Sequence, residues 1–188
     1  MTITTSENTT ATTATVRPVV GWLAAAGAIA SAVAGAIQAV RSDDGNPLVG
    51  TSEHVLLAMV AAALVFWIPG YLALGRLAGT RTARIGAWLA VAGSALLALG
   101  MTSTNLHDQD YSWFPIVAAP ANLFWLLGSI LLAVATWRTR TLPRPLAFAL
   151  VLVWLTSIIL SQAGGNLIAG VIWGFVAWSL LAAARRTA

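Results

Sequence analysis

The chain has 188 residues, of which 59% are hydrophobic and 9% are charged, and its formal net charge is +4. Soluble domains carry about one quarter charged residues, so this composition excludes an ordinary water-soluble domain. It indicates that the chain is surrounded by a lipid bilayer. The chain has no cysteine and no lysine. This excludes disulfides, thiolate metal sites and lysine Schiff bases, and we expect no cofactor. The basic residues are all arginines that flank apolar runs instead of forming one patch, so we expect no nucleic-acid partner.

Residues 1–18 form a threonine-rich segment that is nearly uncharged, with Glu7 as its only acidic side chain. The segment lacks the basic region and the following apolar stretch of a secretory signal peptide. It has little apolar surface to bury, and we therefore predict a disordered cytoplasmic tail.

Six apolar runs follow the tail. A hydrocarbon core of about 30 Å needs about 20 apolar residues in a helix, and the runs are continuous rather than alternating, which favours helices over a barrel. The fifth run is short and is joined to the sixth through Ala163-Gly164-Gly165, where glycine permits a tight hairpin. We predict an all-α, polytopic membrane protein in which 19–184 form a six-helix transmembrane bundle. The predicted spans are 19–40, 55–74, 85–105, 114–137, 146–162 and 166–184, before a basic cytoplasmic end at 185–188.

The arginines indicate the orientation of this bundle, because arginine in short loops marks the cytoplasmic side. The loops on the other side carry Asp43, Asp44, Glu53, Asp108 and Asp110, with Arg41 as their only arginine. We therefore predict that both termini are cytoplasmic. The arginine-rich, lysine-free composition further suggests a bacterial plasma membrane. The nine arginines on the predicted cytoplasmic side are Arg17, Arg76, Arg81, Arg84, Arg138, Arg140, Arg144, Arg185 and Arg186.

Small residues recur at four-residue spacing in the first and last spans, as Gly27-x-x-x-Ser31-x-x-x-Gly35 and Gly170-x-x-x-Gly174. Helices in lipid associate through such small residues because their backbones can approach closely. The pattern favours packing inside the bundle, and the alternative is an interface with a partner membrane protein or a second copy.

Several tryptophans lie deep within the predicted spans, and their positions leave open whether they fill the bundle or face lipid. They are Trp67, Trp125, Trp154, Trp173 and Trp178.

The predicted spans contain no Asp, Glu, Lys, Arg or His, which disfavours a proton pump, a pair of haems and an embedded protease. Neutral polar residues instead collect in the outer half. Amides that are unpaired in lipid cost free energy, so these groups should face one another, water or a ligand. We predict a cup that opens outward and binds a ligand. Its candidate residues are Gln38, Thr102, Asn105, Asn122, Ser161, Gln162 and Asn166.

Two histidines, His54 and His107, fall at the same predicted outer face, close to Glu53 and Asp108. Imidazole and carboxylate are suitable ligands for a divalent metal. Their spacing matches no metal-binding array. The sequence therefore favours ordinary solvated side chains over a metal site.

Three functions agree with this pattern, and the first is a module that binds or transports a small solute from the outer side. Its size and six-helix topology are similar to the substrate-binding components of energy-coupling-factor vitamin transporters, whose alanine-rich first helix resembles Ala24-x-x-x-Ala28-x-x-x-Ala32. That resemblance implies that a partner would supply the energy and that no ATP is bound here. The second is a non-catalytic accessory subunit. The third is a membrane enzyme with a metal at the outer face, which we favour less than a protein without catalytic activity.

Overall fold

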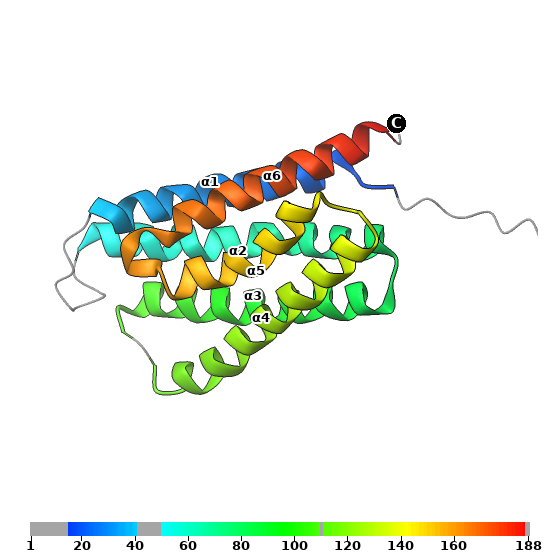
Figure 1. Cartoon of the computed structure of the whole chain (residues 1–188). Coiled ribbons are helices and arrows are strands. Elements are labelled where there is room, and N and C mark those ends of the chain that lie inside the picture. The colour runs from blue at the N-terminus through cyan, green and yellow to red at the C-terminus, as the bar shows by residue number, and fades with distance from the viewer. Residues whose placement is uncertain (1–14, 41–49, 110, 187–188) are drawn as a thin grey trace, which may run out of the picture.

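The computed structural model describes residues 15–40, 50–109 and 111–186. These residues form six α-helices and one short 3₁₀ turn, with no strand among them (Figure 1). Most of the threonine-rich tail lies outside the described residues, as do Asp43, Asp44 and Asp110. The elements are α1 (Pro18–Val40), α2 (Thr51–Ala78), α3 (Arg81–His107), α4 (Phe114–Arg138), α5 (Arg144–Ile158), η1 (Ser161–Ala163) and α6 (Gly165–Arg186).

Five of these helices, all except α5, are long and apolar enough to cross a membrane, with 22 to 28 residues each. The helix α5 has 15 residues and ends earlier than the sequence predicts, because the chain leaves the α-helix after Ile158 and turns through η1. At 1.5 Å per residue it is about 22 Å long, which is less than the hydrocarbon thickness of about 30 Å.

The break after α5 is covered by protein. Gly164 adopts a left-handed backbone at φ 77°, and an added Cβ there would lie 2.9 Å from the carbonyl oxygen of Gly35 in α1. Irregular backbone at membrane depth is tolerated only where protein or a water-filled cavity covers it. The close approach of α1 meets this condition.

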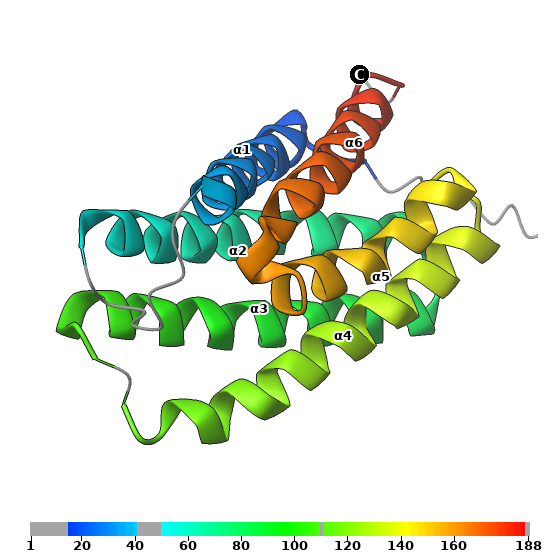
Figure 2. The same cartoon turned by 60° about the vertical axis from the view of Figure 1, so that its left-hand side comes forward.

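Successive helices run in alternating directions and pack in chain order, and α6 returns to pack against α1, which closes the ring (Figures 1 and 2). The helix α2 also contacts α4 and α6 across the ring. In contrast, the backbone of α5 lies close to α4, α6 and η1 and to no other described element.

Charge is segregated between the two ends of the bundle. The start of α1, the α2–α3 and α4–α5 turns and the end of α6 lie at one end, together with the nine arginines that the sequence assigned to one side (Figure 1). We call this the arginine end. The opposite end carries Glu53, His54, His107 and Asp108 on α2 and α3, and we call it the histidine end.

Three buried tryptophans from α2, α4 and α6 fill the middle of the ring. Trp67 stacks on Trp173 with ring centroids 5.0 Å apart and an interplanar angle of 7°, and Trp67 and Trp125 lie 6.5 Å apart. Glycines make room for the indoles. A Cβ at Gly70 would lie 2.7 Å from Trp173, and a Cβ at Gly27 would lie 2.7 Å from Trp67. These three tryptophans are therefore core residues, whereas Trp178 is 68% exposed.

Most of the small-residue pattern is used inside the bundle. Gly35 packs against the backbone of Leu167 in α6, and an added Cβ at Gly170 would lie 2.7 Å from the carbonyl oxygen of Ala28 in α1. Gly174 differs, because a Cβ there would meet nothing within 4 Å. Within the motif Gly170-x-x-x-Gly174, the first glycine therefore lies in a packing interface and the second lies on an open surface.

Candidate functional site

The predicted ligand residues at the histidine end form separate pairs between neighbouring helices. The most deeply buried pair joins α1 to α6. The Asn166 side-chain amide donates to Gln38 Oε1 at 3.0 Å, and the Ser31 hydroxyl donates to the Asn166 carbonyl oxygen at 2.7 Å. Interhelical hydrogen bonds of this kind stabilise bundles in lipid. This contact fixes the start of α6 against α1.

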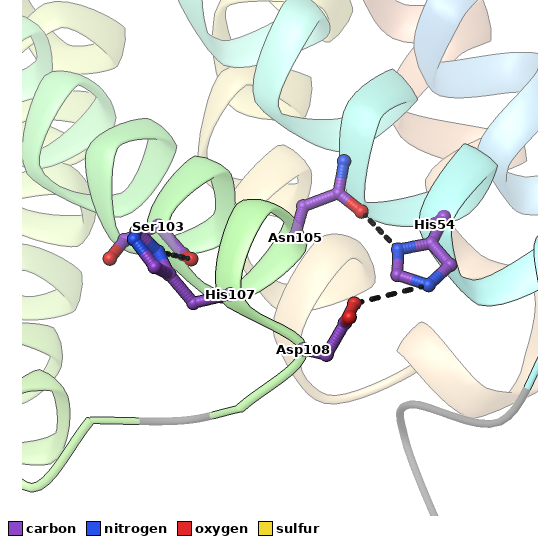
Figure 3. Close-up of polar contacts among 5 residues, drawn as sticks. All are labelled: His54, Ser103, Asn105, His107 and Asp108. Atoms are coloured by element: carbon purple, nitrogen blue, oxygen red, sulfur yellow. Dashed lines mark hydrogen bonds and ion pairs between the residues drawn. The ribbon is translucent and has the colours of Figure 1, made fainter.

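A second pair joins α2 to α3 (Figure 3). His54 Nδ1 lies 2.8 Å from Asn105 Oδ1, and because that oxygen can only accept, the imidazole donates. His54 Nε2 lies 3.4 Å from the Asp108 carboxylate, and the two side chains are 39% and 73% exposed, respectively. The ring therefore forms an ion pair with Asp108 when it carries its second proton.

The four residues expected as metal ligands come together only in part. His107 turns to the other side of α3, where its Nδ1 lies 2.8 Å from the Ser103 carbonyl oxygen (Figure 3). Glu53 accepts a hydrogen bond from the Ser52 hydroxyl at 2.8 Å. Within residues 15–40, 50–109 and 111–186, no three His, Asp or Glu side chains form a group that could hold a metal ion. Of the four expected ligands, His54 and Asp108 lie side by side.

The third pair joins α4 to α5. The Trp154 indole donates to Asn122 Oδ1 at 3.2 Å, and the Asn122 amide donates to the carbonyl oxygen of Ala118 at 2.9 Å. Of the remaining expected residues, Thr102 and Gln162 are exposed, and the half-buried Ser161 donates to the Ile158 carbonyl oxygen at 3.1 Å. The structure therefore brings Gln38 and Asn166 together, but it distributes the other residues around the ring.

Below these pairs, a small cavity lies among α2, α3, α4, α5 and α6. Its volume is about 20 Å³, which is enough for one water molecule, since a water needs about 10–15 Å³. Ser157 lines the cavity from α5, and its buried hydroxyl has no hydrogen-bond partner. Leaving a buried hydroxyl unpaired costs about 1–3 kcal/mol. The residues that line the cavity are Val60, Ala63, Leu64, Trp67, Leu97, Met101, Trp125, Ser157, Ile158 and Asn166.

A second group of buried polar atoms also includes Trp125. The Trp125 indole, which also lines the cavity, donates to the Tyr71 hydroxyl at 2.7 Å. Ser94, Ser129 and Trp173 lie near the same hydroxyl, but in geometries that leave their own polar atoms without a hydrogen bond. We call Tyr71, Ser94, Trp125, Ser129 and Trp173 the tyrosine cluster.

Sequence reasoning did not select Tyr71 or Trp125 as site residues. A tyrosine deep in an otherwise apolar span was the available signal, because a buried phenol normally finds a hydrogen-bond partner. The cavity and the tyrosine cluster offer hydroxyl and indole groups and no charged side chain. This chemistry suits a neutral polar ligand or water.

No protein-family model, curated protein or solved structure matches this chain.

Proposed function

We propose that this chain is a multi-pass protein of a bacterial plasma membrane that binds a small, neutral, polar solute from the histidine end. The observation that supports it is the unpartnered Ser157 hydroxyl on the wall of a buried cavity. Ligand sites are mostly apolar hollows with a few polar groups that fix orientation, and this cavity has that composition.

The proposed orientation follows from the arginine end. Arginine in short loops accumulates on the cytoplasmic side, so the arginine end faces the cytoplasm, both termini lie there, and the cavity is nearer the outer face. The short α5 and η1 together make the sixth crossing. A solute from outside then meets the polar pairs first and the cavity next.

A solute larger than water requires the cavity to widen, and α5 is the wall that can move. It packs against two helices and η1, whereas α2 contacts four helices. It is also short, and beyond its end at Ile158 the chain turns through η1 to Gly164. Hinges are a few residues at the ends of elements that absorb the change in backbone angles. Outward displacement of α5 would carry Ser157 away from α2 and α3 and open the cavity.

Introduced cysteines test the movement, because the chain has none of its own. We expect Ser157→Cys to react with a small membrane-impermeant thiol reagent added from the histidine side, more slowly than the control Gln109→Cys, which is exposed beyond the end of α3. The reagent cannot fit a cavity of about 20 Å³, so labelling requires opening. An unreactive Ser157→Cys beside a reactive Gln109→Cys would refute the opening of α5.

Binding itself is tested with a thermal-shift screen of neutral metabolites on the purified chain. A ligand that binds only the folded state raises its stability by RT ln(1 + [L]/Kd). We expect Ser157→Ala to weaken a hit at least fivefold, because one hydrogen bond is lost. Ser161→Ala is the matched control, since Ser161 bonds to its own turn. Equal effects of the two variants on every hit would contradict the proposed site.

The other two functions expected from the sequence have less geometric support. Gly27, Gly35 and Gly170, which motivated an accessory subunit, pack within the bundle. Of the residues that motivated a metal-dependent enzyme, His54 and Asp108 meet, while His107 lies apart.

A further inference from the structure

A hollow lies at the arginine end, between the α4–α5 turn and the last turns of α6. Its volume is about 680 Å³, within the usual range for ligand sites. Three arginines from different parts of the chain line it, namely Arg140 in the turn, Arg144 at the start of α5 and Arg186 at the end of α6. All three are exposed.

Among the residues that the structure describes, no carboxylate side chain lines this hollow. The described residues include two carboxylate side chains, Glu53 and Asp108, and both lie at the histidine end. Arg140 adopts a left-handed backbone at φ 56° just past the end of α4, where the Thr141 amide donates to the Thr136 carbonyl oxygen at 3.0 Å and closes the helix end. The guanidinium groups of the hollow therefore offer binding groups for an anion that is not part of the described residues.

A second hollow continues from the first along α6. It has a volume of about 360 Å³ and is lined by Val171, Gly174, Phe175 and Trp178. Trp178 borders both hollows. This second hollow is open at Gly174, since an added Cβ there would meet nothing within 4 Å. The track thus begins among arginines, passes an exposed tryptophan and continues into a purely apolar groove.

We propose that this track binds one anionic phospholipid. The phosphate group would lie among Arg140, Arg144 and Arg186, because guanidinium groups bind phosphate through two parallel hydrogen bonds. An acyl chain would lie in the groove over Gly174. Tryptophan is favoured at the boundary between headgroups and hydrocarbon, and Trp178 occupies the junction of the two hollows. Basic pockets between transmembrane helices on the cytoplasmic side are known to hold anionic headgroups.

Native mass spectrometry of the full chain in a non-ionic detergent tests the proposal. We expect phosphatidylglycerol to bind the wild-type chain at least tenfold more tightly than phosphatidylcholine with the same acyl chains. The affinity of the double variant R140Q/R186Q for phosphatidylglycerol should be about tenfold lower or more, because each arginine near an anionic headgroup strengthens lipid binding. The control R81Q/R84Q removes the same charge from the same end, outside the hollow, and should keep near wild-type affinity. Equal losses in the two double variants would overturn the site.

The acyl part has its own test. Gly174→Leu should fold, because the space around Gly174 is open, and it should weaken phosphatidylglycerol binding severalfold by filling the groove. Ala119→Leu, on an exposed position of α4, is the control and should have no effect. Unchanged binding of phosphatidylglycerol to Gly174→Leu would show that no acyl chain lies in the groove. Full displacement of the lipid by equimolar inorganic phosphate would show a site for free anions. Either result would overturn the lipid proposal. A dimer that disappears in Gly174→Leu would also overturn it, in favour of an interface between two copies.

Discussion

The glycines Gly170 and Gly174 provide a sharp test of the fold, because they share one helix and one sequence motif but have different surroundings. A methyl group at Gly170 would lie 2.7 Å from the Ala28 carbonyl oxygen and 2.9 Å from the Ala32 amide nitrogen. These are backbone atoms, so α1 must move away by several tenths of an ångström. A methyl group at Gly174 meets nothing.

The expected free energies follow from these contacts. Alanine is favoured over glycine in a helix by about 1 kcal/mol, so Gly174→Ala should be neutral or stabilising by up to that amount. Overpacking costs about 1–3 kcal/mol, and this exceeds the helix preference at Gly170. We expect Gly170→Ala to be destabilised by up to about 2 kcal/mol, and because the helix preference is shared, the two variants should lie about 1–3 kcal/mol apart.

Reversible unfolding in mixed micelles, with SDS as denaturant and tryptophan fluorescence as the signal, measures this difference. The stacked Trp67 and Trp173 report on contact between α2 and α6, and that contact is lost on unfolding. If Gly170→Ala is as stable as Gly174→Ala, the α1–α6 interface described here is wrong.

Two further changes test the buried polar contacts with the same measurement. Tyr71→Phe leaves the Trp125 indole without an acceptor and should cost about 1–2 kcal/mol; a double-mutant cycle with Trp125→Phe that gives no coupling energy would exclude this hydrogen bond. Asn166→Ala removes the hydrogen-bond donor to Oε1 of the buried Gln38 and should cost about 1–3 kcal/mol. Asn105→Ala, whose histidine partner is partly exposed, should cost less, and the reverse order would contradict the burial of the α1–α6 pair.

The helices and the separation of charge could be predicted from the sequence because both are local properties. The length of an apolar run sets the length of a helix, as in α1, where the predicted 19–40 corresponds to Pro18–Val40. The fifth helix was overestimated, since Ser161 and Gln162 were counted within it although the α-helix ends at Ile158. Polar residues before a glycine pair permit either continuation or a turn, and packing against α1 selects the turn.

The inward faces of the helices were decided by tertiary structure. Helices in lipid are apolar on all sides, so hydrophobic periodicity does not distinguish a core position from a lipid-facing one. Gly170 and Gly174 are equivalent in sequence, yet only Gly170 contacts another helix. The partners of polar groups are non-local as well, since Asn166 finds Gln38 128 positions away in the chain. The positions of the helices and the end that carries the arginines follow from local sequence, whereas the contacts around Ser157 and Tyr71 exist only once six helices close into a ring.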